Sequence, residues 1–460
     1  MALVEDYGSS SGSEDDYESK TVEQIAGVIS NKQHENTVPM VQVDRVTISK
    51  RKRKDDPLKN TAEKKEKKGR KGPWDAWSYD ESDSSSDNTG DKYIAEELET
   101  FQDVEKPDDE DIKVKEESHF YGESEKDYQG RGFLHPPADI ETDLTKKPMS
   151  FKCYLPKKII HTFPGHSRGV NTLNFLPLSG HLFLSSGNDS LIKIWDFHHQ
   201  RKCLRDYRGH TRPVKAIDFS SDGTQFLSAS FDQSVKLWHT ESGKVLSRLK
   251  LNSTPNDVKI HPLKANEFIV GCSNSKIYHY DTRIAAKEGR VQVYDHHLSS
   301  ILYLKFFPDG SRFISSSEDK TVRIWENQIN IPVKQISDTA QHSMPYLDIH
   351  PSGQYFCAQS MDNTIYTYNM KPKYKRHPKK SFTGQMCAGY GIGIAFSPDG
   401  KYICSGDAQS KVLIWDWTTT NLLRTVPLPG NEPVRQVAWN PQETSKLICG
   451  GPTGKIYLLD

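Results

Sequence analysis

The stretch Leu191-Ile192-Lys193-Ile194-Trp195-Asp196 decides the fold, because a similar stretch returns six more times along the chain. Apolar and polar residues alternate in most of the copies, as they do in a half-buried strand. The position of Trp195 recurs at 238, 280, 325, 368, 415 and 459, at spacings of 43, 42, 45, 43, 47 and 44 residues. A period of this length is typical of an array of small β-sheets.

Three of the copies also carry the same polar residues at fixed distances. A histidine precedes the tryptophan by 28 or 29 residues and an aspartate precedes it by six. This pattern resembles the WD-repeat family, which implies that the three residues form a buried hydrogen-bonded network with a strand serine, so that none is left unpaired. We interpret the network as structural, since a catalytic dyad does not repeat along a chain. Its members are His166, Asp189 and Trp195; His210, Asp232 and Trp238; and His297, Asp319 and Trp325.

The repeats predict an all-β protein with a seven-bladed WD-repeat β-propeller over residues 155–460. The seventh repeat ends after its third strand. Residues 158–163 alternate like a strand but belong to no repeat. We expect this segment to supply the missing outer strand and to close the ring, which removes an exposed sheet edge. Removing residues 155–163 should open the propeller.

The charge of the chain divides it in two. The 460 residues hold 61 Lys+Arg and 61 Asp+Glu, but residues 1–150 have a net charge of −13 and residues 151–460 a net charge of +13. The first part is rich in Ser, Glu, Asp and Lys and poor in aliphatic runs, so it cannot bury enough apolar surface to offset its chain entropy. We expect a long, largely disordered N-terminal tail at 1–150 that carries short docking motifs.

A basic block at 50–71 contains two clusters separated by nine residues. This spacing suits a bipartite nuclear-import signal. The alternatives are an arm that binds the phosphates of a nucleic acid and a solvated charge run that no partner recognises. The cationic residues are Lys50, Arg51, Lys52, Arg53, Lys54, Lys64, Lys65, Lys67, Lys68, Arg70 and Lys71.

Two segments of the tail are too apolar to be simple spacers. Gly72, Pro73 and Trp74 follow the basic block and indicate a docking motif. Because a Gly-Pro bond exchanges slowly between cis and trans, a cyclophilin-type prolyl isomerase could act on it. The second segment, 128–137, should lie on a partner or on the propeller itself, unless it is an ordinary linker. Its candidate contacts are Tyr128, Arg131, Phe133 and Leu134.

A second basic stretch, at 371–380, should join blades five and six. Cations interleaved with a tyrosine suit a phosphate backbone or single-stranded RNA. An acidic partner, this chain's own acidic tail included, and an ordinary solvated loop are the other readings. The candidate residues are Lys371, Lys373, Tyr374, Lys375, Arg376, Lys379 and Lys380.

Several classes of protein are excluded. The chain has no phosphate-binding glycine loop, no nucleophile motif and no metal-spaced His/Cys set, so we expect no catalytic residue, metal, cofactor or small-molecule substrate. It has no apolar run long enough to span a membrane and no secretory signal. The seven cysteines form no CxxC pair and fit a reduced interior.

The chain as a whole resembles the pre-mRNA-processing factor 17 (cell division cycle 40 homologue) family of spliceosomal proteins. The resemblance covers the propeller and, in islands, the tail. It implies a nuclear, non-enzymatic scaffold of the second catalytic step of splicing, whose partners are spliceosomal core proteins and the ribonucleoprotein of snRNA and pre-mRNA. The motifs that carry it lie at 7–14, 72–74, 128–135, 153–158, 177–182, 342–345, 359–363, 388–390 and 443–446.

Two other functions are compatible with a WD-repeat propeller. A substrate receptor of a ubiquitin ligase would need a degron pocket on one face and no tail motifs. A chromatin-binding adaptor would suit the acidic tail. Nuclease-sensitive association with small nuclear RNA separates both from a splicing factor.

Overall fold

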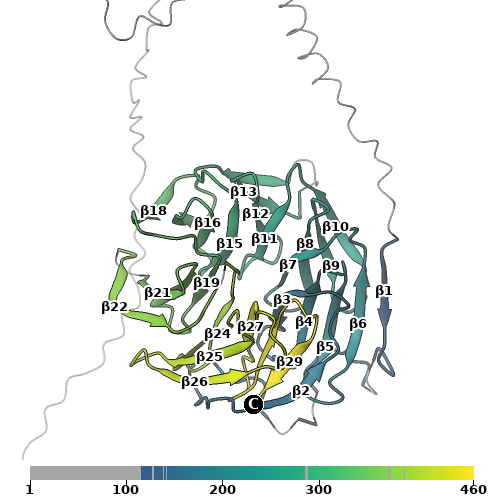
Figure 1. Ribbon diagram of the computed structural model, residues 1–460. Helices are drawn as coiled ribbons and strands as arrows, with labels where there is room; N and C mark the ends of the chain where they lie inside the picture. Colours follow the sequence, from purple (N-terminus) through teal and green to yellow (C-terminus); the bar gives the residue numbers. More distant parts are fainter. Residues whose placement is uncertain are drawn as a thin grey trace, which may run out of the picture. The chain divides into compact units, whose positions relative to one another are not determined.

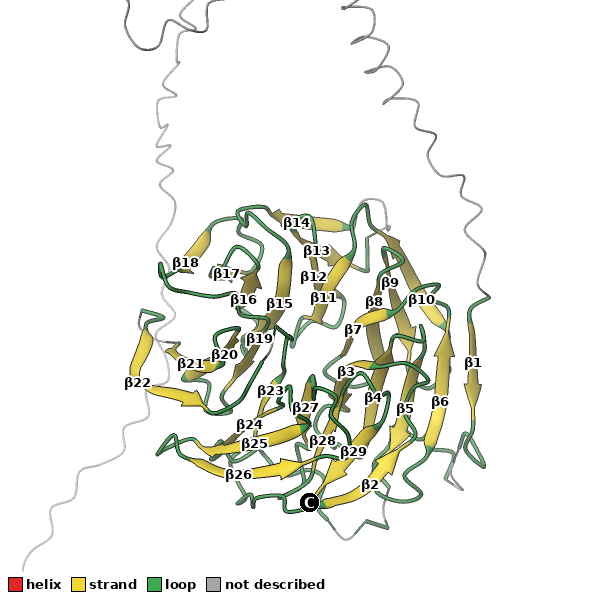
Figure 2. Cartoon of the chain, viewed as in Figure 1, coloured by secondary structure: helices red, strands yellow, loops and turns green. Residues whose placement is uncertain are grey.

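The computed structural model describes residues 115–126, 129–137, 139–140, 142–284, 289–370, 373–387 and 389–460. All the regular elements in these ranges are strands (Figure 2). The strands form seven separate antiparallel sheets, and the sheets follow one another around a ring (Figure 1). The protein is therefore an all-β, seven-bladed propeller, as the repeat predicts.

Each blade takes four consecutive strands, except the last. Blades one to four contain β3 (Val170–Phe175), β4 (Leu182–Gly187), β5 (Ile192–Asp196) and β6 (Cys203–Arg208); β7 (Val214–Phe219), β8 (Gln225–Ser230), β9 (Ser234–His239) and β10 (Val245–Lys250); β11 (Pro255–Ile260), β12 (Glu267–Cys272), β13 (Ile277–Asp281) and β14 (Arg290–Tyr294); and β15 (Ile301–Phe306), β16 (Arg312–Ser317), β17 (Val322–Glu326) and β18 (Pro332–Ile336). Blades five to seven contain β19 (Tyr346–Ile349), β20 (Tyr355–Ser360), β21 (Thr364–Asn369) and β22 (Arg376–Thr383); β23 (Ile394–Phe396), β24 (Tyr402–Ser405), β25 (Lys411–Asp416) and β26 (Leu422–Pro427); and β27 (Gln436–Trp439), β28 (Leu447–Gly450) and β29 (Ile456–Leu459) with β2 (Ile159–Phe163).

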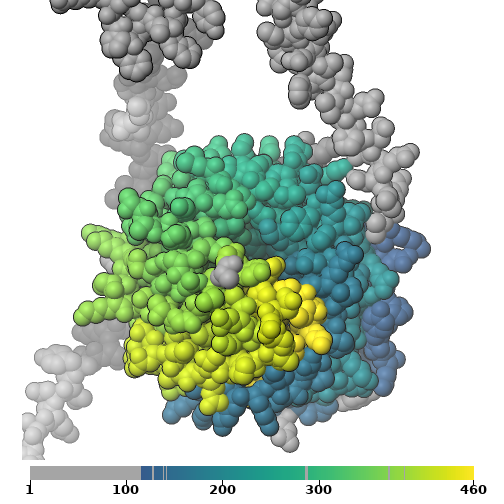
Figure 3. Space-filling view, viewed as in Figure 1, coloured from purple at the N-terminus to yellow at the C-terminus, as the bar shows by residue number. Residues whose placement is uncertain are grey.

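Aromatic residues of each repeat hold neighbouring blades together. Trp238 in blade two is fully buried, and its ring lies 5.8 Å from that of Tyr207 at the end of blade one. Trp325 in blade four contacts Tyr294 of blade three in the same way, at 5.2 Å. The repeated aromatic therefore forms the interface with the preceding blade, and Figure 3 shows the blades packed side by side around one face.

The ring closes through the strand that precedes the first repeat. β2 pairs antiparallel with β29, the last strand of blade seven. Phe163 at its end has no exposed surface and contacts Phe183 at 5.0 Å and Trp195 at 5.6 Å, both in blade one. The segment expected at 158–163 thus occupies the outer position of blade seven and packs against blade one.

Blade one carries a fifth strand that the repeat analysis did not foresee. β1 (Glu117–Phe120) pairs antiparallel with β6 and lies beside it at the rim of the ring (Figure 1). The boundary that we placed between tail and propeller near 150 is therefore too late, because residues 117–120 already pair with blade one. Short strands and loops without a repeat carry no periodic signal, so composition alone assigned them to the tail.

Other expectations concern what the chain lacks. No helix in the described ranges is long and apolar enough to cross a membrane. The described residues contain no group of His, Cys, Asp and Glu side chains arranged to hold a metal ion. All seven cysteines are free, and six of them are buried.

Candidate interaction surfaces

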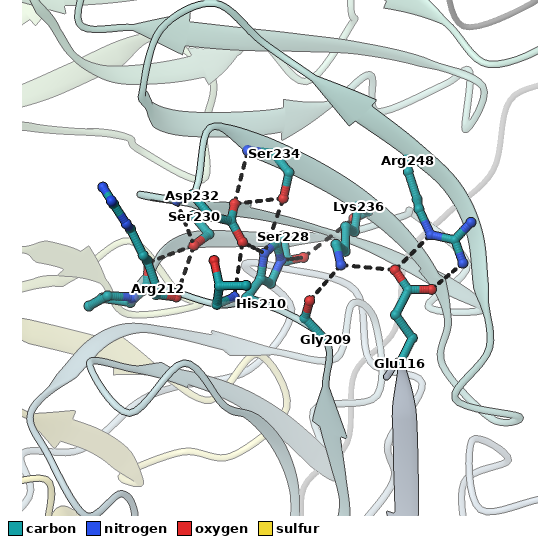
Figure 4. Close-up of polar contacts among 12 residues, drawn as sticks. Glu116, Gly209, His210, Arg212, Ser228, Ser230, Asp232, Ser234, Lys236 and Arg248 are labelled. Atoms are coloured by element: carbon teal, nitrogen blue, oxygen red, sulfur yellow. Dashed lines mark hydrogen bonds and ion pairs between the residues drawn. The ribbon is translucent and has the colours of Figure 1, made fainter. Parts of the chain in front are cut away.

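The repeated polar residues lie together in three blades. In blade two, His210 Nδ1 lies 2.8 Å from Asp232 Oδ2 and His210 Nε2 lies 2.7 Å from Ser228 Oγ, which also accepts a bond of 2.9 Å from Trp238 Nε1. Figure 4 shows the histidine between the aspartate and the serine. The corresponding groups with Ser185 and Ser315 complete blades one and four. Each network joins a loop, a turn and two strands of one blade.

The aspartates of these networks stay ionised to low pH. Burial raises the pKa of Asp232 and of Asp319, because it opposes the negative charge. Hydrogen bonds from the histidine and from neighbouring hydroxyl and amide groups, with the electrostatic attraction of the histidine, have the larger effect. They hold both pKa values well below the usual value. A carboxylate with a depressed pKa stabilises the fold above its unfolded-state pKa, and this stabilisation disappears as the pH falls through the folded-state value.

We therefore expect Asp232→Asn to destabilise the protein at pH 7 by about 2 kcal/mol, the scale of a buried hydrogen bond to a charged group. The difference from wild type should shrink as the pH falls below about 4, because the carboxylate then begins to protonate in the unfolded chain while it stays ionised in the folded one. Urea unfolding between pH 7 and pH 3.5 measures it. A difference that stays constant with pH would contradict the assignment.

Glu116 ties the N-terminal extension, which we define as residues 115–158, to blade two. Its Oε1 accepts a bond of 2.9 Å from Lys236 Nζ and one of 2.6 Å from Arg248 Nε, and the second guanidinium nitrogen of Arg248 meets Oε2. Figure 4 shows the carboxylate between the two cations. The bond from Arg248, working against burial and aided by Lys236, lowers the pKa of Glu116 to about 2.

Blade one holds the next part of the extension through a second acidic residue. Arg205 is only 3% exposed; its guanidinium donates to Glu125 at 2.7 Å and to Ser118 at 3.0 Å. Its carbon Cζ also lies 5.2 Å from the ring centroid of Phe120. Acidic residues of the extension thus neutralise cations on blades one and two, which agrees with the charge asymmetry between the two parts of the sequence.

The described part of the segment, residues 129–137, lies on the propeller. Phe133 and Leu134 are half-buried against the core of blades one and two, and Phe133 stacks on Phe120 at 5.7 Å. The ring of His181 is buried between Ser179 Oγ at 2.8 Å and the Phe133 carbonyl at 3.2 Å, and burial lowers its pKa to about 4. Of the two places expected for this segment, Phe133 and Leu134 thus take the one on the propeller itself.

The rest of the extension crosses the ends of blades six and seven. The amide of Cys153 donates to Asp399 Oδ2 at 2.8 Å, the amide of Tyr154 donates to the Thr444 carbonyl at 2.9 Å, and the Gln442 side chain donates to the Lys146 carbonyl at 3.0 Å. The propeller therefore fixes a segment that has almost no regular structure of its own.

The sequence motifs that resemble a family gather at two places. The turns at 177–182 and 443–446 contact the motifs at 128–135 and 153–158 of the extension. The motifs at 342–345 and 359–363 meet at the opposite ends of the strands of blade five, where the Met361 amide donates to the Ser343 carbonyl at 3.1 Å. The amide of Cys387, next in sequence to the motif at 388–390, donates to Asn363 Oδ1 at 2.6 Å. Sequence reasoning had no signal for either meeting.

Residues 376–380 of the basic stretch belong to the outer strand of blade five rather than to a connection between blades. β22 pairs with β21, and two of its cations lie on aromatic rings of the propeller: Arg376 on Tyr366 at 3.7 Å and Lys380 on Trp417 at 4.0 Å. Tyr374 is a wrong candidate for base stacking, because it is buried and its hydroxyl accepts a bond of 2.8 Å from Arg312. The exposed cations are Lys373, Lys375, Arg376 and Lys379.

The centre of the ring holds a charged cavity of about 660 Å³. Lys259 and Asp257, both buried, line it with their Nζ and Oδ1 atoms 3.7 Å apart, and Asp218 lies 3.4 Å from the same Nζ. Lys305 pairs with Asp348 across the next blade at 3.0 Å. The two carboxylates raise the pKa of Lys259 against the effect of burial. Lys259 and Lys305 are therefore neutralised within the protein.

Other predicted site residues lie outside the described residues. They are Lys371, Tyr128, the docking motif Gly72, Pro73 and Trp74, and the import block at 50–71. Arg131 is described, half-buried and engaged with a neighbour.

The chain matches known proteins in fold and in sequence. Residues 157–196, 201–239, 289–326 and 377–416 match the family model "WD domain, G-beta repeat". The crystal structure of the β-propeller domain of Cps50 (Swd1) from Myceliophteria thermophila has a TM-score of 0.57 with 18% identity, and the match covers 66% of this chain and 99% of that one. This likeness concerns the fold alone.

Two curated relatives carry the same name. Pre-mRNA-processing factor 17 of Saccharomyces cerevisiae is 60% identical over 395 residues, which are 84% of this chain and 85% of that protein. The human protein of that name is 41% identical over 336 residues; the match covers 73% of this chain and 57% of the human one. The chain therefore belongs to the pre-mRNA-processing factor 17 family.

Proposed function

We propose that this protein is a pre-mRNA splicing factor, and that it acts as a nuclear, non-enzymatic scaffold in the remodelling between branching and exon ligation. The observation that carries the proposal is the 60% identity to a pre-mRNA-processing factor over 84% of the chain. The structure supports a scaffold, since the polar networks resembling catalytic dyads join strands within blades. A splicing role implies partners among spliceosomal proteins and RNA.

The exposed cations of blade five are the proposed contact with RNA. Lys373, Lys375 and Lys379 present ammonium groups that suit a phosphate backbone without sequence preference. We also propose nuclear import through the block at 50–71. Gly72, Pro73 and Trp74 are a proposed docking motif for a partner such as a prolyl isomerase.

The test is the splicing of a labelled pre-mRNA in an extract depleted of this protein. Free first exon and lariat–exon intermediate should accumulate, and added protein should restore ligated exons. Add-back of Lys373→Ala/Lys375→Ala/Lys379→Ala should restore less product, whereas Lys264→Ala, which changes an exposed lysine of blade three, should restore it fully.

Two outcomes would move the function elsewhere. A block before any intermediate keeps the splicing role and overturns the second-step assignment. Normal completion of both steps overturns the splicing role, and the ubiquitin-ligase receptor or the chromatin adaptor then becomes the leading function.

A further inference from the structure

The residue two places before the blade tryptophan is a cation in blades one, two and four. In blade one Lys193 Nζ donates to the Gly165 carbonyl at 2.8 Å. In blade two Lys236 Nζ donates to the Gly209 carbonyl at 2.6 Å and also binds Glu116 of the extension. Because side chains two residues apart on a strand share a face, each cation lies on the tryptophan side of its blade, toward the preceding blade.

Arg323 occupies this position in blade four and lacks a comparable partner. It is 6% exposed, and among the described residues its buried Nε has no hydrogen-bond partner. Burial lowers its pKa, and among the described residues the charge that opposes this shift is that of Asp319, whose carboxylate is already bonded to His297 and Thr321. A buried cation without its own counter-ion is costly to the fold.

Blade two shows how such a cation is completed. β1 pairs with β6 in a register that places Glu117 opposite Arg208. The preceding residue, Glu116, then lies at the end of β6 beside the groove between blades one and two, where it meets Lys236 and Arg248. An added strand on one blade therefore delivers a carboxylate to the next blade.

The junction between blades three and four has the same strand arrangement without the added strand, except that His296, whose side chain is 41% exposed, stands where blade two has Gly209. β14 is the outermost strand of blade three in the described part of the chain, and Val291 on it is 39% exposed. Tyr294 packs against Trp325 as Tyr207 packs against Trp238. In blade four, Gln335 of β18 stands opposite Arg323. In blade two, the corresponding residue of β10 is Arg248, which stands opposite Lys236.

We propose that the outer edge of β14 binds an extended segment of a partner protein, which pairs with β14 as β1 pairs with β6 and places the carboxylate of one acidic residue on Arg323. The backbone of β14 supplies the hydrogen bonds and Arg323 supplies the charge that selects the partner. This surface goes beyond the proposed splicing role and does not depend on it.

The register also predicts a second feature of the partner. Asp295 follows Tyr294 as Arg208 follows Tyr207, so Asp295 is the counterpart of Arg208. In blade one, Glu117 stands opposite Arg208. A carboxylate directly opposite Asp295 would be repelled, whereas a cation would be attracted. The preferred segment therefore carries an acidic residue for Arg323, followed directly by a basic one.

A fluorescent synthetic peptide tests the site. Its sequence is that of residues 115–121 with Glu117→Lys, and it is titrated into the full-length chain by fluorescence anisotropy. We expect binding that Arg323→Gln weakens about tenfold, the scale of one charge-assisted hydrogen bond. A second peptide also carries Glu116→Gln. It should bind the wild-type chain about tenfold more weakly than the first peptide does, and it should bind the Arg323→Gln chain as well as the first peptide does.

Two further variants separate binding from folding. Arg323→Lys should keep most of the affinity, because lysine serves at positions 193 and 236. Lys334→Gln removes a charge of the same sign from an exposed position on β18, outside the proposed edge, and should change binding less than twofold. The free Arg323→Gln chain should melt no lower than wild type, since it loses an uncompensated buried charge.

Several results would overturn the proposal. The first is equal affinity of wild type and Arg323→Gln for the peptide. The second is loss of binding in Lys236→Met instead, because the peptide would then replace β1 on blade one. The third is a clearly lower melting temperature for Arg323→Gln. A cross-link, in the full chain without peptide, from a photoreactive residue at 291 to residues 75–111 would also overturn the proposal, because the chain itself would then fill the edge.

Discussion

A chain that begins at residue 164 should fail to unfold cooperatively and should aggregate, whereas one that begins at residue 115 should melt like the full-length protein. The longer truncation removes β2, the outer strand of blade seven. It also strips the contacts of Phe163, which is fully buried between blades seven and one. The exposed edge of β29 would then be free to pair with another molecule.

Single substitutions measure the same closure in a chain that still folds. Phe163→Ala should lower the free energy of unfolding by about 3–5 kcal/mol, the range for deleting a buried phenylalanine ring. Since whole domains are stable by only about 5–15 kcal/mol, this is a large share. Thr162→Ala, at an exposed position of the same strand, should cost under about 0.5 kcal/mol. Chemical denaturation gives both values, and a 164–460 chain that melts normally would show that closure does not need β2.

Lys259→Met should cost about 3–5 kcal/mol at pH 7, as expected when one partner of a buried ion pair is removed. The change leaves Asp257 and Asp218 without the ammonium group that lies 3.7 Å and 3.4 Å from them. Burial raises the pKa of Asp257 even while Lys259 is present, and the pKa should rise further without it. The variant therefore loses stability as the pH rises above the unfolded-state pKa near 4, so its deficit should be larger at pH 7 than at pH 5.

A surface ion pair of the extension serves as the control. Lys115 pairs with Glu117 at 2.8 Å, and their side chains are 86% and 53% exposed. Lys115→Met should cost under about 1 kcal/mol, because solvent screens an exposed pair. Equal losses for the two variants, measured by urea unfolding at both pH values, would contradict the role assigned to the channel pair.

Local rules explain why the propeller could be read from the sequence. Strand alternation and the placement of Trp195, Trp238 and Trp325 depend on residues within one repeat. The members of each polar network are also close in the chain, with His210 and Asp232 22 residues apart. The closing strand followed from the need to remove a sheet edge, which is a rule of topology rather than of composition.

The extension shows where this reasoning stops. Glu116 lies 120 residues from Lys236, and Cys153 lies 246 residues from Asp399. No periodicity links such positions, and the acidic composition around Glu116 favours disorder when it is considered alone. The propeller supplies the cations and the open edge of β6 that order the segment, so its composition misplaced the boundary.

The sequence by itself determined the number of blades, their boundaries and the polar networks, because these depend on contacts within one repeat of about 43 residues. The tertiary structure alone decided which charges are satisfied. It buried Tyr374, placed Arg376 and Lys380 on aromatic rings, and gave Lys236 a carboxylate while leaving Arg323 without one. The physical reason is that the energy of a charge depends on burial and on partners brought from distant parts of the chain.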